Sequence, residues 1–241
     1  MKVIGVLCWY DESPTWLCAT VASAAAICDH LVAVAGAYAL FPGGSGSSGA
    51  AQHEAIAKTA EAVGLGLTLH VPNAKWTGNE VEKRSYSYRL AATIGCEEDW
   101  VLVLDADDVI LQCPSTVRER LHDTDLMVGQ VSHLERWDPH ADPSVSSYAH
   151  VADVSSSPRV PIRKFFRLLP GLRCDVTHFH HVAYEGDHTL HLWGNGSWPE
   201  EPALDCTDMV IEHRTRLRAR ERARRQQAYY QTRDVAGIER A

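Results

Sequence analysis

The sequence predicts an α/β protein of one domain with a mostly parallel central sheet. Near the N-terminus, two apolar segments flank an alanine-rich helical segment, and this order of strand, helix and strand is typical of parallel sheets. Four consecutive apolar residues, Val101 to Leu104, are typical of a strand buried on both faces. The chain of 241 residues, of which 45% are hydrophobic, is long enough to bury a sizeable core.

The first half of the chain is expected to alternate strands and helices. Pro14 is placed to start the first helix, because its fixed φ suits the first helical turn. Gly64 and Gly95 are expected to end the second and third helices, since a glycine commonly follows the last helical residue. Tyr86, Leu90 and Ile94 form the apolar stripe of the third helix. The expected elements are strand 2–8, helix 14–28, strand 31–39, helix 52–63, strand 65–71 and helix 79–94.

The second half of the chain is less regular, with more polar residues between its apolar segments. We expect a long polar hairpin or loop over 133–161, and long loops of this kind often carry contacts to a substrate. The other expected elements are a short helix over 114–122, a strand over 126–132, a strand over 162–169 and a histidine-dense segment over 177–192.

Three aspartates, Asp105, Asp107 and Asp108, come directly after the buried strand. Removing several like charges from water is costly unless a cation neutralises them, so these residues predict a divalent metal held by oxygen ligands. An aspartate after a strand can also be an ordinary turn or cap residue, which would account for one of the three. Open α/β sheets bind ligands outside the carboxyl ends of their strands, and this favours the site.

The charge of the chain is unevenly distributed. The formal net charge is −8, yet residues 213–225 hold seven arginines and one glutamate, a local charge of +6. Such a segment is either a solvated helix or a binding surface for an anion. The sharper hypotheses are that its first turns hold a diphosphate, or that Arg214 to Arg225 contact a polyanionic acceptor such as nucleic acid. Binding of this kind would weaken steeply with salt.

The seven cysteines form no C-x-x-C pair, and most lie in apolar segments, which favours reduced, buried thiols. No apolar run reaches the length of a membrane span, and no signal peptide is recognised. We therefore expect a cytoplasmic protein.

Five histidines, His178, His180, His181, His188 and His191, gather late in the chain. Imidazole is a good zinc ligand, so this group makes a zinc-dependent hydrolase an alternative function. No H-E-x-x-H spacing supports it, and the simpler interpretation is a set of histidines around an acceptor pocket.

Taken together, several segments resemble the glycosyltransferases of the GT-A fold, especially the family 2-like enzymes. A lone D-x-D motif is weak, but the order of these segments covers nearly the whole chain. The segments that carry the resemblance are Trp9 to Glu12, Lys83 to Arg84 with Tyr86 to Ala91, Leu104 to Asp108, Phe165 to Arg167 with Pro170 to Arg173, and Ile211 to His213.

The resemblance implies a Rossmann-like nucleotide-diphospho-sugar transferase domain over 1–241. Residues 1–108 would form the half that binds the nucleotide-sugar donor, 109–212 the acceptor half, and 213–241 a C-terminal basic helix. It implies transfer of a sugar from a nucleoside-diphosphate sugar to an acceptor hydroxyl, with Mn²⁺ or Mg²⁺ as cofactor. The implied metal ligands are Asp105, Asp107 and His213, and the implied donor-binding residues are Asp11, Glu12, Lys83, Arg84 and Asp105.

The acceptor side departs from the family pattern. The family's acid is missing after His180, so an inverting enzyme would need Glu185, Asp187 or His181 as its general base, whereas a retaining enzyme needs no such base. The missing acid also makes a nucleotide-sugar-binding module without turnover an alternative. The acceptor is expected to be an unidentified hydroxyl compound, such as a modified base in DNA.

Overall fold

The computed structural model describes residues 1–38, 48–77, 80–135, 159–175, 177–194, 199–214 and 228, without the side chains of residue 135 and of 177–179. The helices are α1 (Pro14–Ala24), α2 (Ala50–Ala62), α3 (Glu80–Ala92) and α4 (Thr116–Asp123). The strands are β1 (Val3–Cys8), β2 (His30–Val34), β3 (Gly66–His70), β4 (Trp100–Asp105), β5 (Asp108–Gln112), β6 (Val128–Glu135), β7 (Arg159–Arg167), β8 (Arg173–Asp175), β9 (Thr177–Glu185), β10 (His188–Trp193) and β11 (Ala203–His213).

Eight strands form the central sheet in the order β3-β2-β1-β4-β7-β6-β11-β5. The pairs from β3 to β4 are parallel, as is the pair of β6 and β11, while β7 and β5 run antiparallel to their neighbours. Strands β8, β9 and β10 form a separate small antiparallel sheet. The predicted α/β class with a mixed, mostly parallel central sheet is therefore confirmed.

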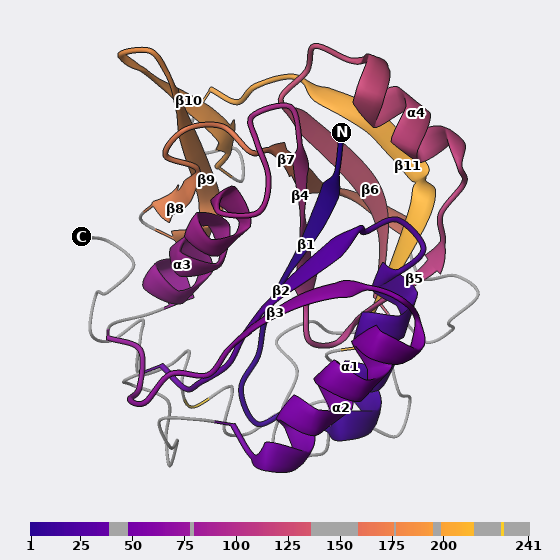
Figure 1. Ribbon diagram of the computed structural model, residues 1–241. Helices are drawn as coiled ribbons and strands as arrows, with labels where there is room; N and C mark the ends of the chain where they lie inside the picture. Colours follow the sequence, from indigo (N-terminus) through magenta and orange to yellow (C-terminus); the bar gives the residue numbers. More distant parts are fainter. Residues whose placement is uncertain are drawn as a thin grey trace.

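Elements cover both faces of the central sheet (Figure 1). One core joins Trp100 and Phe165 to residues of α1, α2 and α4, and the other joins Tyr88 of α3 and Phe166 to the small sheet. Because the crossovers from β1 to β3 run in one direction along the sheet and the crossover to β4 runs in the other, the right-handed rule places α3 opposite to α1 and α2. The order in which strands are added to the sheet thus reverses between β1 and β4.

Most expected elements in the first half form where the sequence pattern predicts them, but α1 ends at Ala24 and β2 at Val34, before the expected ends at 28 and 39. The buried face of α3 also differs from the expected stripe. Helix α3 buries Lys83, Tyr88 and Ala91, whereas Leu90 of the expected stripe is only partly buried. The physical reason is that α3 lies over the polar ends of β1 and β2, where the buried polar side chains make hydrogen bonds.

Gly95 follows the end of α3 as expected, since its amide donates to the Ala91 carbonyl at 3.0 Å, and it also has a packing role. Helix α3 ends at Ala92, and a Cβ at Gly95 would lie 2.7 Å from Cδ1 of Ile4 and 2.8 Å from Cδ2 of Leu168. Gly64 does have the expected left-handed backbone, with φ of +69° after α2.

The two described ends of the segment expected to be a hairpin or loop, 133–161, form paired antiparallel strands, as in a hairpin. Strand β6 continues to Glu135 and β7 begins at Arg159, because these two strands pair with each other from Val128 to Leu134. Residues 136–158 of that prediction lie outside the described residues. Within the described ranges, no helix has the length and apolar character of a membrane span.

Candidate functional site

The aspartates of the predicted site lie between β1 and β4, where the strand order of the sheet reverses. Cys8, the last residue of β1, pairs with Asp105, the last residue of β4. The carboxyl ends of these strands are adjacent, and α/β sheets bind ligands outside such a reversal point. Asp11 and Glu12 follow β1 and so belong to the same edge, and Gln52 of α2 donates a hydrogen bond of 2.6 Å to the Glu12 carbonyl.

Asp105 is held by two cations from different elements. Its Oδ1 accepts a hydrogen bond of 2.7 Å from Arg84 of α3, and its Oδ2 accepts one of 3.1 Å from Lys164 of β7. Burial opposes ionisation of Asp105, but Lys164 and Arg84 outweigh it and hold its pKa far below the ordinary value. The predicted donor-binding residues Arg84 and Asp105 therefore form one ion pair.

Asp108 is the most enclosed carboxylate of the group, with none of its surface exposed. Its Oδ2 accepts hydrogen bonds from Lys164 at 2.8 Å and from the Asp105 amide at 2.9 Å. Its Oδ1 lies 2.7 Å from Nδ1 of His213. Burial alone would raise the pKa of Asp108, but Lys164 and the neighbouring histidines hold it well below the ordinary value. Asp108 stays charged inside the protein because cations surround it.

His213 lies between two carboxylates at the end of β11. Its Nε2 is 3.7 Å from Oδ2 of Asp107, and its Nδ1 contacts Asp108 on the other side. Burial lowers the pKa of His213, but Asp107 and Asp108 overcome this effect and raise it to about 9. His213 is therefore an imidazolium at neutral pH in the metal-free protein.

His133 completes a group that could hold a metal ion. Ligand atoms of Asp108, His133 and His213 all lie within 4.8 Å of one another. Nε2 of His133 is buried, is 3.6 Å from Oδ1 of Asp108, and makes no hydrogen bond in the described part of the chain. This orphaned ring nitrogen, together with a carboxylate and a second imidazole, fits a divalent metal.

The group differs from the ligand set that the resemblance implies. Of Asp105, Asp107 and His213, only His213 belongs to it, and the other two members are Asp108 and His133. Asp107 is buried beside His213, while Asp105 is held by Arg84 and Lys164. His133 was missed because it falls at the start of the segment that the sequence predicted to be a hairpin or loop.

Lys164 is the second residue that sequence reasoning missed as part of the site. It lies on β7 at a β-bulge, where Gly129 pairs with Phe165 but the next residue of β6, Gln130, pairs with Arg163. A bulge changes which way a side chain points, so the simple alternation of faces does not apply to Lys164. The run of basic residues at 163, 164 and 167 was a signal, but it did not distinguish the buried lysine from the arginines.

Lys83 lies beneath the same edge and is fully buried. Its ammonium donates hydrogen bonds of 2.7 Å to the Trp9 carbonyl and 2.8 Å to the Gly36 carbonyl, and it lies 5.2 Å from the centre of the Tyr38 ring. Lys83 therefore joins the segments that follow β1 and β2.

The structure does not bring the three candidate general bases to the aspartates. His181 is buried and stacks on Phe166 at 4.4 Å between ring centres. Glu185 and Asp187 are exposed at the turn between β9 and β10. Glu185 lines a cavity of about 450 Å³ with Glu97, which precedes β4, so it lies near the amino end of that strand.

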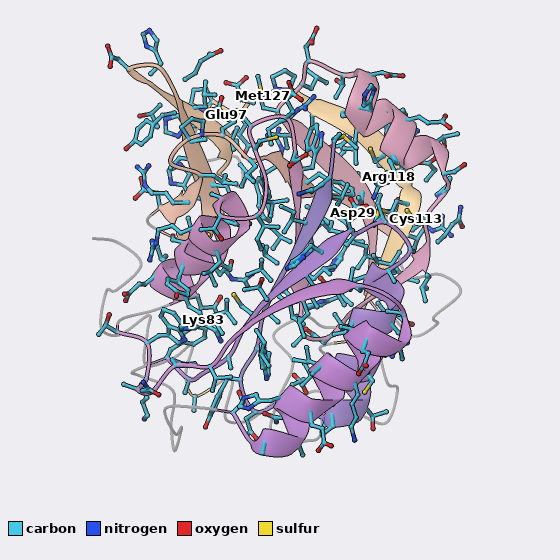
Figure 2. The ribbon with its side chains drawn as sticks, viewed as in Figure 1. Asp29, Lys83, Glu97, Cys113, Arg118 and Met127 are labelled. Atoms are coloured by element: carbon cyan, nitrogen blue, oxygen red, sulfur yellow. The ribbon has the colours of Figure 1, made fainter. Side chains whose placement is uncertain are left out.

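Figure 2 shows the separation of these two edges, with Lys83 toward one end of the sheet and Glu97 and Met127 at the other. Met127 lines the same cavity as Glu185. The carboxyl edge of β4 and the hairpin turn are thus on different sides of the molecule.

The histidine-dense segment that suggested a zinc hydrolase is built into the small sheet. Nε2 of His180 lies 3.0 Å from Nδ1 of His191, and the two rings stack in parallel. His188 is exposed, and the side chain of His178 lies outside the described residues. Among the described residues, the group that could hold a metal is at Asp108 and not in this segment.

The charge of His213 predicts how stability depends on pH. Because its pKa rises from 6.5 to about 9 on folding, the stabilisation is complete below about pH 6.5 and is lost as the pH rises through 9. In chelator, we compare the free energy of unfolding of wild type with that of His213→Gln. The advantage of wild type should be larger at pH 6.5 than at pH 9.5, by at most roughly 3 kcal/mol. Urea unfolding of both proteins at the two pH values measures this difference. A constant difference would contradict the charged pair.

Comparison of the sequence with protein families finds no match, and comparison with curated proteins finds none either. Among solved structures, mannose-6-phosphate isomerase from Helicobacter pylori is 9% identical, with a TM-score of 0.34 over 57% of this chain and 52% of that one. A protein from Bacillus anthracis with the provisional name glucose-1-phosphate thymidylyltransferase, solved with a sucrose, is 9% identical, with a TM-score of 0.32 over 56% of each chain. The chain thus covers about half the length of each, and the likeness of fold is distant.

Proposed function

We propose that this protein is a metal-dependent glycosyltransferase of the GT-A type, which transfers a sugar from a nucleoside-diphosphate sugar. One observation carries the proposal: Asp108, His133 and His213 form a possible metal group at the edge where β1 and β4 end. Ligand binding at such a reversal point, cations from α3 and β7, and an orphaned imidazole nitrogen all support a site for a metal and an anionic ligand.

The chemistry explains why such a site would be useful. Departure of a nucleoside diphosphate leaves strong negative charge beside a cation-like sugar, and a bound divalent ion stabilises that charge. Asp108, His133 and His213 would hold the ion. Arg84 and Lys164 keep Asp105 ionised and fixed, and 28% of its side chain is exposed.

The ligand types favour some metals over others. Mg²⁺ prefers oxygen ligands, whereas imidazole suits transition metals. With two imidazoles and one carboxylate, this group suits Mn²⁺ better than Mg²⁺. We therefore propose Mn²⁺ as the first ion to test, and donor-binding roles for Asp11 and Glu12 on the loop after β1.

The acceptor stays a prediction from the sequence. Most of the arginine segment lies outside the described residues, but its first member, Arg214, donates its backbone amide to the Asp107 carbonyl at 2.9 Å. Arg214, where the segment begins, therefore lies beside the proposed donor site. We propose an anionic acceptor such as DNA for 214–225.

The test is a thermal-shift panel of nucleoside diphosphates with and without Mn²⁺, followed by release of diphosphate from the matching nucleotide sugar. A ligand at about one hundred times its Kd stabilises the folded state by about 2.7 kcal/mol, which raises Tm by roughly 5–11 °C in a chain of this size. His133→Ala should weaken Mn²⁺ binding at least about tenfold. The matched control is His188→Ala, because His188 is an exposed histidine of the small sheet.

The outcomes separate the alternatives. Stabilisation with diphosphate release supports the enzyme, whereas stabilisation without release from any nucleotide sugar supports a binding module. If no nucleoside diphosphate shifts Tm beyond the shift with Mn²⁺ alone, the proposed function is wrong.

A further inference from the structure

We propose that Lys164 is an internal counter-ion that takes the place of the divalent metal: its ammonium holds Asp105 and Asp108 in the metal-free protein and competes with the metal for Asp108. This inference rests on the metal site of the proposed function and adds a regulation of that site. It follows from the position of Lys164 and from the carboxylates it contacts.

The geometry places one ammonium on the two carboxylates. Nζ of Lys164 donates to Oδ2 of Asp105 at 3.1 Å and to Oδ2 of Asp108 at 2.8 Å, and only 4% of the residue is exposed. A group of buried acids needs a cation, which the sequence suggested to be a metal. In this structure the chain supplies a cation from β7 itself.

The same carboxylate also belongs to the metal group. Asp108 presents Oδ2 to Lys164 and Oδ1 to His213 and His133. A divalent ion on Asp108 and an ammonium on its other oxygen would repel each other across one carboxylate. Metal affinity should therefore be lower with Lys164 in place than without its charge.

Arg84 cannot take over this role, because it contacts Asp105 and Glu80. Lys164 is also the extra residue of the β-bulge, so it has no partner residue in the register of β6 and β7, and the bulge sets the direction of its side chain. A lysine suits an exchangeable contact, since its ammonium is a point charge on a flexible stem, whereas an arginine forms a rigid fork.

A purely structural counter-ion would behave differently. If Lys164 only stabilises the fold, neutralising it weakens the protein and leaves metal affinity unchanged or reduced. If Lys164 competes with the metal, neutralising it strengthens metal binding while weakening the metal-free fold. The two measurements together distinguish these roles.

The experiment measures Mn²⁺ affinity by electron paramagnetic resonance of the free ion, and Tm in chelator and in Mn²⁺, for wild type, Lys164→Met and Lys164→Gln. Both variants remove the charge, and glutamine keeps a hydrogen-bond donor, so it serves if the methionine variant does not fold. We expect a lower Tm in chelator, recovery in Mn²⁺, and Mn²⁺ binding at least about tenfold tighter, the size of effect that one neighbouring charge has on a carboxylate.

The matched control is Lys58→Met, which removes an exposed lysine paired with Glu54 on α2 and should leave both measurements unchanged. Lys164→Arg keeps the charge and should bind Mn²⁺ no more tightly than wild type. If wild type binds Mn²⁺ and the charge-neutral variants bind it equally or more weakly, the role of Lys164 is overturned but the metal site stands. If neither wild type nor the neutral variants bind Mn²⁺, the metal site itself is wrong.

Discussion

Replacing Asp108 with alanine is expected to lower the free energy of unfolding by about 3–5 kcal/mol, the usual cost of breaking a buried ion pair from one side. Asp108 is fully buried and accepts hydrogen bonds from Lys164 and from the Asp105 amide. Its removal leaves the Lys164 ammonium with one carboxylate and takes a carboxylate away from His213. In a chain of this size, the loss corresponds to a decrease in Tm of roughly 6–20 °C. Urea and thermal unfolding in chelator measure both quantities.

Two further variants separate charge from shape and site from surface. Asp108→Asn keeps the size of the side chain, so a similar loss in this variant would assign the effect to the charge. Asp187→Ala changes an exposed aspartate in the turn between β9 and β10 and should leave Tm unchanged. A fall in Tm of less than about 2 °C for Asp108→Ala would contradict the described ion pairs. In Mn²⁺, the variant should also lose the stabilisation that the metal gives wild type.

Replacing Lys83 with methionine is expected to cost about 3 kcal/mol, because two hydrogen bonds from a charged donor are lost and two buried carbonyls are left unsatisfied. Methionine preserves most of the apolar stem of the lysine, which packs beneath the sheet edge. The Lys83 ammonium joins the Trp9 and Gly36 carbonyls, which follow β1 and β2. We therefore expect both a lower Tm and weaker nucleotide binding, since the loop with Asp11 and Glu12 starts at this point.

The readouts for this variant are urea unfolding and a titration with the nucleoside diphosphate that the thermal-shift panel identifies. Lys58→Met serves again as the matched control, because it replaces a lysine that is exposed on α2. If Lys83→Met lowers nucleotide affinity but keeps the wild-type free energy of unfolding, the prediction is contradicted. Lys83 would then contact the ligand directly, and its hydrogen bonds to the Trp9 and Gly36 carbonyls would not stabilise the fold.

Local patterns in the sequence were enough to predict the elements that build the site. The apolar run before Asp105 predicted β4, and Pro14 predicted where α1 begins. Both are confirmed because a strand buried on both faces and a proline in the first helical turn depend mainly on neighbouring residues. The acids at the end of β4 were identified for the same reason, and their need for a cation was inferred correctly.

The identity of that cation could not be predicted from the sequence. Lys164 lies 56 residues from Asp108, and a β-bulge changes the direction of its side chain. Helix α3 packs its expected apolar stripe against the core, and it also buries Lys83, since the helix lies over polar strand ends. Such contacts depend on which strands become neighbours.

The sequence by itself determined that carboxylates stand at the end of a buried strand and that an α/β sheet carries them. The family resemblance already implied His213, which lies 105 residues from Asp108 in the chain. Only the tertiary structure decided what else surrounds the carboxylates: Lys164 comes from β7, and His133 comes from β6, at the start of a segment expected to be a hairpin or loop. The physical reason is that apolar alternation and turn residues act over short stretches of chain, whereas the charges that neutralise a buried acid are brought to it by strand order, which places β11 beside both β6 and β5.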